Sequence, residues 1–190
     1  DALDAPAHDR DFSYSRFGKL PILFKGRHQP LDSFARNSLV QIYERYAFYD
    51  PVEKRSIPAT EWLAEAMFRP EPARDRRVFR VDHPDVISLL QLPLKDEAKG
   101  FDGKHYSFNQ ILGGTNINSL QEQSQRAAAK DDSQRDAFDQ AVLRLGNALM
   151  LFNALQNSAR PMGATQLVPE LTQFQQALPR GQGVLETARA

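Results

Sequence analysis

Cysteine is absent from this chain of 190 residues. Its absence excludes disulfide bonds, thiolate zinc sites, cysteine nucleophiles and the C-x-x-C-H motif that attaches heme covalently. It leaves the compartment open, because a chain without thiols is compatible with either redox environment.

Long hydrophobic runs are absent as well. A membrane-spanning helix needs about 20 consecutive apolar residues, and the densest stretch here, at 149–155, is interrupted by Asn153. The chain starts at Asp1 and shows no segment in which charges precede an apolar run, as in a signal peptide. We therefore interpret it as a processed or excised fragment whose parent protein could carry membrane segments.

Neither sign of charge predominates, because 24 Lys and Arg balance 24 Asp and Glu. The total therefore gives no electrostatic argument for binding nucleic acid or an anionic membrane. Arg74, Arg76 and Arg77 form a local group that an aspartate interrupts, and we expect a solvated loop there. Hydrophobic residues make up 41% of the chain, which is enough to bury a core at this length.

The patterning predicts a mainly α fold of the α+β type. We expect a loose leader at 1–16 and a single mainly helical domain at 17–160. A short helix and a flexible tail are expected at 161–190, which is rich in Pro, Gly and Gln. The predicted β-structure is a small N-terminal hairpin and one further short strand.

The hairpin prediction rests on Lys25-Gly26, which separates the alternating segment 20–24 from Arg27-His28-Gln29. A residue followed by glycine between two extended segments is typical of a tight turn, with Gly26 at positive φ. Pro30 is expected to end the second strand, because proline lacks the N–H that a strand pair needs.

Two helices should follow the hairpin. Asp32 or Ser33 is expected to cap the first, which ends at Asp50-Pro51. The second is expected from about residue 58 to 68, with Trp62 on its apolar face.

Further elements are predicted from strand and cap signals. A short strand is expected at 78–81. Asp82 is expected to cap a third helix that carries Pro84 in its first turn, and Ser107 to cap a short helix through Leu112.

The strongest helical pattern lies at about 133–159. Its apolar residues recur in steps of four and three, which gives one continuous stripe along a long amphipathic helix. The stripe has two interpretations. In the first it is covered within the chain, either by the core or by the preceding helix at 116–129, and in the second it is a dimer seam. Its members are Phe138, Val142, Leu145, Leu149 and Phe152.

No motif of catalysis or metal binding is present. The four histidines include no pair with the i, i+4 spacing of a helical metal site. The nucleophile elbow, the phosphate-binding loop and the dinucleotide fingerprint are all missing. Glu61 and Glu65 share a helix face, and we interpret them as solvated charges rather than as an acid/base pair. We therefore predict no catalytic residue, no metal ligand and no cofactor in this domain.

One segment resembles a known family. The sequence G-R-H-Q-P-L-D-S-F-A-R-N at 26–37 is similar to a stretch of bacterial cytochrome c biogenesis proteins related to the System II synthetase. Three further landmarks of that family follow in the same order. They are A-T-E-W-L at 59–63, V-F-R-V-D-H-P-D-V at 78–86 and Y-S-F-N at 106–109.

The resemblance implies a periplasmic domain tethered to the inner membrane through its parent protein. It implies a non-catalytic accessory role in delivering or attaching heme, with heme held only by the parent. The implied partners are apocytochrome c, other maturation components and the membrane-embedded remainder of the parent. The family's Trp-rich heme segment and membrane histidines are not in this chain, so the synthetase activity is not carried over.

Within the first motif, Arg27, Asp32, Arg36 and Asn37 are the candidate ligand- or partner-binding residues. One interpretation is a buried polar network that joins hairpin and helix. The other is that Arg27 and Arg36 hold a heme propionate or a peptide carboxylate, which the planar guanidinium suits. Other motif residues are expected to be structural: Gly26, Pro30, Glu61, Trp62, Arg80, Asp82 and Pro84.

Two rival functions remain open at this point. The domain could be a structural spacer or oligomerisation domain that assembles through the long helix. It could also be an enzyme of unrecognised type, which would need convergent polar groups in a pocket.

Overall fold

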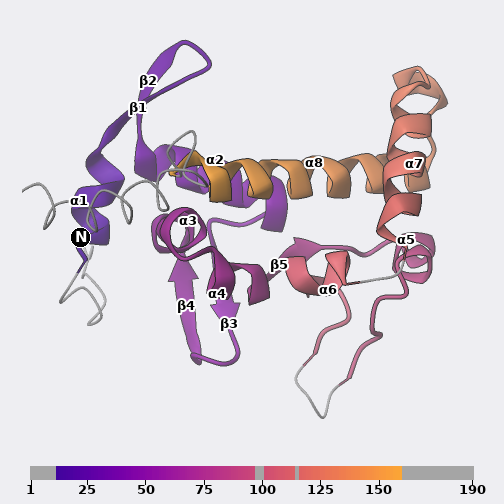
Figure 1. Cartoon of the computed structure of the whole chain (residues 1–190), viewed down its shortest axis with the longest axis horizontal. Helices are drawn as coiled ribbons and strands as arrows, with labels where there is room; N and C mark the ends of the chain where they lie inside the picture. The colour runs from indigo at the N-terminus through magenta and orange to yellow at the C-terminus, as the bar shows by residue number, and fades with distance from the viewer. Residues whose placement is uncertain (1–11, 97–100, 114–115, 160–190) are drawn as a thin grey trace, which may run out of the picture. The chain divides into compact units, whose positions relative to one another are not determined.

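The computed structural model describes residues 12–96, 101–113 and 116–159. These residues form a mainly helical α+β fold with three two-stranded antiparallel sheets (Figure 1). The predicted mainly helical α+β class is therefore confirmed, whereas the predicted β-structure, one hairpin and one further strand, is less than the three sheets observed. One compact unit ends at Asn157, and the predicted helix and tail at 161–190 lie outside the described residues.

The N-terminal part begins with helix α1 (Tyr14–Lys19), which Ser13 caps through its side chain. Tyr14 and its two helical successors fall within the predicted loose leader, so that segment is partly helical. Phe17 is buried in the core. It brings α1 onto the domain.

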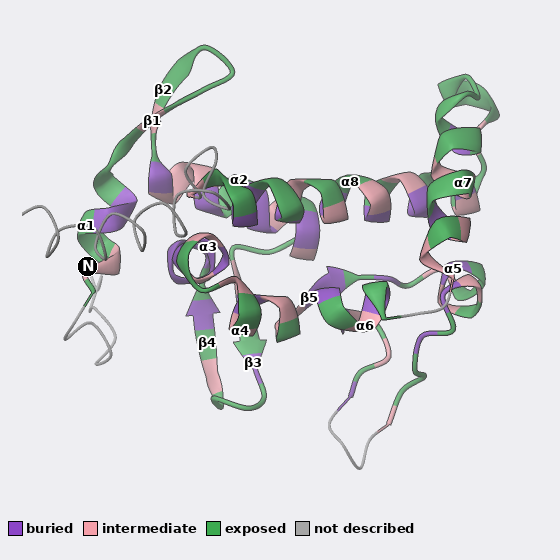
Figure 2. Cartoon of the chain, viewed as in Figure 1, coloured by how far each residue is buried: buried purple, intermediate pink, exposed green. Residues whose placement is uncertain are grey.

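The predicted hairpin is present as β1 (Pro21–Phe24) and β2 (Arg27–Pro30), paired antiparallel. Gly26 has φ of +76°, as predicted, and Lys25 also has a positive φ, of 50°. Figure 1 shows the hairpin projecting beyond α1 and α2, and Figure 2 shows it mainly exposed. The hairpin is therefore an appendage rather than part of the core.

Helix α2 (Leu31–Tyr43) follows directly, with Pro30 at its N-cap position and no side-chain cap. The prediction that Asp32 or Ser33 caps this helix was wrong, because Leu31 is already helical and Asp32 lies in the first turn. The helix ends earlier than predicted, at Tyr43, where Glu44 takes a left-handed conformation with φ of 64°.

A second hairpin replaces the predicted end of that helix. Strand β3 (Ala47–Asp50) pairs with β4 (Arg55–Pro58). The alternation of buried and exposed residues favours strands here, because Phe48 and Ile57 are opposite each other and both are buried. The Asp50 carboxylate closes the turn by accepting the backbone N–H groups of Val52 and Glu53, at 2.7 and 2.9 Å.

The middle of the chain alternates short helices and strands. Strand β5 (Arg77–Arg80) begins and ends one residue before the predicted strand at 78–81. Its partner β6 (His105–Ser107) was not predicted. Ser107 and Gln110 form a capping box on α6, as the sequence indicates for Ser107. The helices here are α3 (Ala59–Phe68), α4 (Pro70–Asp75), α5 (Pro84–Leu89) and α6 (Phe108–Leu112).

The cap of α5 is His83, not Asp82 as predicted. The His83 side chain accepts the backbone N–H of Asp85 at 3.3 Å. Asp82 instead accepts a hydrogen bond from Arg80 at 2.9 Å. The carboxylate is thus used by the neighbouring arginine. Pro84 occupies the first turn, as predicted.

Two longer helices complete the described fold, α7 (Ile117–Ala128) and α8 (Ala137–Ser158). Phe152 of α8 lies at the centre of the core. Its ring centroid is 5.3 Å from that of Phe79, 5.2 Å from that of Phe108 and 6.2 Å from that of Trp62.

The apolar stripe of α8 is covered by the domain itself. Val142, Leu145 and Phe152 are buried, and the other two members, Phe138 and Leu149, pack against the same core while partly buried. This burial supports the core-facing interpretation of the stripe over the dimer seam.

Replacing Leu145 with Ala should therefore lower the free energy of unfolding by about 2–5 kcal/mol, because a buried leucine is lost and a cavity remains. Met150→Ala is the control, since Met150 lies on the same helix with 65% of its surface exposed. It should change stability by less than about 0.5 kcal/mol. Denaturant unfolding and light scattering measure both variants. Folded Leu145→Ala protomers released from a larger wild-type assembly would contradict the prediction.

Candidate functional site

A cluster of charged side chains links the β3–β4 hairpin to α3 and to the residue before β5. We name it the arginine–carboxylate cluster. Two arginines in it face four carboxylates, and all six side chains are at least two-thirds buried. Its members are Asp50, Glu53, Arg55, Glu61, Glu65 and Arg76.

Arg76 is the centre of this cluster. Its Nε and Nη2 donate to the two oxygens of Glu65, each at 2.9 Å, in a bidentate pair. The same guanidinium also bonds Asp50 and Glu53 of the β3–β4 turn. Only 14% of its side chain is exposed. The expectation that Arg76 lies in a solvated loop was therefore wrong.

Arg55 makes the second bidentate pair. Its Nη1 donates to Glu61 Oε2 at 2.9 Å, its Nη2 bonds the other Glu61 oxygen, and its Nε donates to Glu53 at 2.8 Å. The Glu61 side chain is only 10% exposed. Glu61 and Glu65 were predicted as solvated charges, and this was wrong. The second hairpin, which the periodicity missed, brings Arg55 over their helix face.

The pairing controls the protonation of the cluster. Burial alone would raise the pKa of Asp50, but hydrogen bonds from the backbone of Glu53 and from Arg76 lower it below its ordinary 3.8. Burial would likewise raise the pKa of Glu53, but hydrogen bonds from Arg76 and Arg55 lower it below its ordinary 4.5. Both carboxylates are thus ionised at neutral pH and are poor proton donors.

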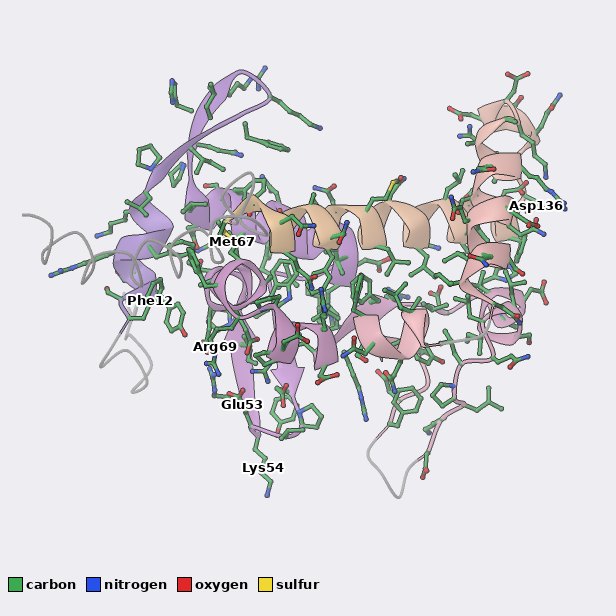
Figure 3. The ribbon with its side chains drawn as sticks, viewed as in Figure 1. Phe12, Glu53, Lys54, Met67, Arg69 and Asp136 are labelled. Carbon is green, nitrogen blue, oxygen red and sulfur yellow. The ribbon has the colours of Figure 1, made fainter. Side chains whose placement is uncertain are left out.

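A cavity of about 580 Å³ adjoins the cluster. One wall is aromatic and is formed by Phe12, Tyr14 and Phe68. Burial, reinforced by the negative Glu61 and Glu65, raises the pKa of the Tyr14 hydroxyl. Figure 3 shows Phe12, Arg69 and Glu53 following one another from α1 past the end of α3 to the second hairpin.

Most of the polar wall of the cavity is engaged in its own contacts. The guanidinium groups of Arg55 and Arg76 each bond two or more carboxylates. At these two arginines a ligand anion would have to displace a carboxylate, whereas Arg69, which also lines the cavity, is not part of the cluster. The arrangement therefore works as a structural clamp that joins the second hairpin to α3.

The predicted polar network around α2 is formed only in part. Asp32 pairs with Arg36 at 3.0 Å and accepts the Thr60 hydroxyl at 2.7 Å, which ties α2 to α3. Within the described residues, Arg27 pairs with no carboxylate. It is exposed beside the hairpin turn, opposite Phe24. Thr60, which the sequence did not single out, takes its place.

The exposed candidates do not converge on one point. Asn37 is exposed, and its carbonyl accepts the Gln41 amide at 3.2 Å. Arg36 is also exposed, one turn and a half into α2, whereas Arg27 precedes the helix by about 13 Å of extended strand. A single carboxylate held by both arginines is not supported by this geometry.

Several of the remaining motif residues make contacts within the fold. Trp62 is fully buried. Arg80 bridges Asp82 and Glu44, and Arg144 of α8 adds a pair to Glu44 at 3.5 Å. These contacts join β5 to the end of α2 and to α8.

Comparison with protein-family models and with curated proteins finds no match for this chain. In the described residues, no helix combines the length and hydrophobicity needed to cross a lipid bilayer. The same part of the chain has no group of three or more His, Asp or Glu side chains placed to hold a metal ion.

Arg76→Ala should lower the free energy of unfolding by about 3–5 kcal/mol, because it leaves buried carboxylates without a partner. The control is Arg36→Ala, which breaks an exposed pair and should cost less than about 1 kcal/mol. Urea unfolding at neutral pH measures both. Equal losses for the two variants would show that burial does not distinguish these ion pairs.

Acid should weaken the clamp. Asp50 and Glu53 have lower pKa values folded than unfolded, so the unfolded chain takes up protons first as the pH falls. Their stabilisation is complete above about pH 5 and is lost through pH 4 and below. The free energy of unfolding at several pH values should show this fall. Arg76→Ala should flatten it, because the main side-chain donor to both groups is gone, while Arg36→Ala keeps the wild-type slope.

Proposed function

We propose that this chain is a non-catalytic periplasmic interaction domain of a membrane-bound cytochrome c assembly protein. The support is that the four segments of the family resemblance come together in one core. Each contributes buried side chains: Leu31 and Ala35, then Trp62 and Leu63, then Val78 and Phe79, and finally Tyr106 and Phe108. The four segments therefore belong to one folding unit.

The non-catalytic part of the proposal is supported by the chemistry of the cluster. A general acid needs a carboxyl group whose pKa lies near the working pH. Asp50 and Glu53 are shifted the other way, and the four carboxylates already hold arginines. We propose no cofactor in this domain, and heme is left to the parent protein.

The proposed docking surface is the exposed side of the first motif. Arg36 and Asn37 are exposed and contribute little to the buried core, and the one ion pair of Arg36, with Asp32, is itself partly exposed. A guanidinium on a helix surface suits a carboxylate of a peptide partner. We propose apocytochrome c or another maturation component as that partner, and the membrane-embedded remainder of the parent as the tether.

The test is a titration of this chain into fluorescently labelled apocytochrome c, followed by anisotropy. Binding in the micromolar range is expected, and Arg36→Glu should weaken it at least tenfold. Arg126→Glu is the matched control, because it makes the same charge change on the exposed side of α7. It should leave the affinity unchanged.

Two results would count against the proposal. One is no binding at concentrations about 100 times above a micromolar dissociation constant. The other is equal weakening by Arg36→Glu and Arg126→Glu, which would indicate a non-specific charge effect. A saturable Soret shift on adding hemin would contradict the assignment of heme to the parent alone.

A further inference from the structure

Helix α1 and the β1–β2 hairpin that follows it have a local excess of positive charge that the balanced total conceals. Residues 12–31 include Arg16, Lys19, Lys25 and Arg27 and no Asp or Glu. Within the described residues, none of these four cations pairs with a carboxylate. Four positive charges therefore face solvent around one projecting element.

The same element exposes apolar side chains. Leu20 is 52% exposed, Leu23 66% and Phe24 39%. The Phe24 ring contacts Phe34 of α2, with centroids 5.0 Å apart. Leu23 follows the alternation of the strand to the opposite face, away from that contact. One face of the hairpin is thus attached to the domain while the other presents leucine to solvent.

The hairpin also has no neighbouring strand on either side, since its sheet contains only β1 and β2. It projects as a convex tip (Figure 1), and neither of the two described cavities includes its residues. A convex tip with leucine beside the turn and cations around it matches a membrane interface, where apolar side chains enter the acyl boundary and cations meet lipid phosphates.

We propose that the tip of the β1–β2 hairpin binds the surface of an anionic lipid membrane. Leu23 enters the interface and Lys25, in the turn, contacts the headgroups, while Arg27, opposite Phe24 on the other face of the tip, adds to the positive charge there. This inference goes beyond the proposed function and does not depend on it, because the contact needs no cytochrome component. It leaves the Arg36 and Asn37 surface of α2 for a protein partner.

The β3–β4 hairpin provides an internal control. Its tip also exposes an apolar residue, Val52, at 87%, and a lysine at positive φ, Lys54 at 53°. It differs in charge, because Asp50 and Glu53 belong to the same turn. The two tips thus separate the effect of charge from that of apolar exposure.

The absence of cysteine makes the test direct, because one introduced cysteine is a unique labelling site. Leu23→Cys and Val52→Cys are each labelled with an environment-sensitive fluorophore. They are mixed with vesicles of phosphatidylglycerol and phosphatidylcholine, or of phosphatidylcholine alone. A blue shift is expected for the label at 23 with anionic vesicles only, and none for the label at 52.

Charge variants then measure the electrostatic part by vesicle sedimentation. Each basic residue near an anionic surface raises the partition coefficient roughly fivefold. Lys25→Gln with Arg27→Gln should therefore lower vesicle binding roughly 25-fold, and Lys25→Gln alone roughly fivefold. Lys54→Gln, which removes one positive charge at the other tip, should have no effect. Far-UV circular dichroism of every variant verifies the fold.

Three outcomes would overturn the proposal. The first outcome is that the label at 23 shows no blue shift when the folded protein is mixed with anionic vesicles. The second outcome is an equal shift of both labels, which would show that membrane binding is not specific to the β1–β2 hairpin. The label at 23 shifts with an acidic polypeptide but not with vesicles, which assigns the tip to a protein partner. None of these results changes the apocytochrome titration, so the two proposals fail separately.

Discussion

The contact on which much of the N-terminal half depends is the buried guanidinium of Arg76. It holds Asp50 and Glu53 in the turn of the second hairpin and Glu65 on α3. Arg76 itself lies between α4 and β5. One side chain therefore sets the position of a hairpin, a helix and the entry to a strand. The geometry is favourable because the planar fork matches a carboxylate, and each of the three guanidinium nitrogens donates to at least one carboxylate oxygen.

The apolar counterpart of this clamp is the aromatic group around Phe152. Trp62, Phe79 and Phe108 belong to three different elements and all meet the same ring of α8. The clamp and the aromatic group contact different faces of α3, since Glu61 and Glu65 face Arg55 and Arg76 while Trp62 faces Phe152. Helix α3 is thus amphipathic in an unusual sense, because both of its faces are largely buried.

Periodicity and cap signals predicted the long helices, the first hairpin and the Ser107 cap. These signals were correct where one local preference determines the structure, as the preference of glycine for positive φ does at Gly26. They were wrong at 44–58, where aromatic residues at helical spacing were followed by an equally valid alternation around Phe48 and Ile57. The choice there depends on what the segment packs against, which one sequence does not show.

The candidate site shows the same division. Asp32 and Arg36 are four residues apart on a helix, and such a pair follows from spacing alone. In the arginine–carboxylate cluster, Arg76 bonds residues 11 to 26 positions away in the sequence, and no local pattern predicts these contacts. The prediction of solvated charges used the usual behaviour of Arg and Glu. Tertiary packing instead buries these charges, because Arg55 and Arg76 both pack against the helix face that carries Glu61 and Glu65.

The position of Phe152 also bears on the order of events during synthesis. The rings that it contacts are all completed by residue 108, whereas Phe152 leaves the ribosome more than forty residues later. Until then Trp62, Phe79 and Phe108 lack their common partner, and the growing chain carries uncovered aromatic surface. Such surface promotes aggregation. This aromatic surface is therefore covered only after α8 has been synthesised, and until then the nascent chain is prone to aggregate.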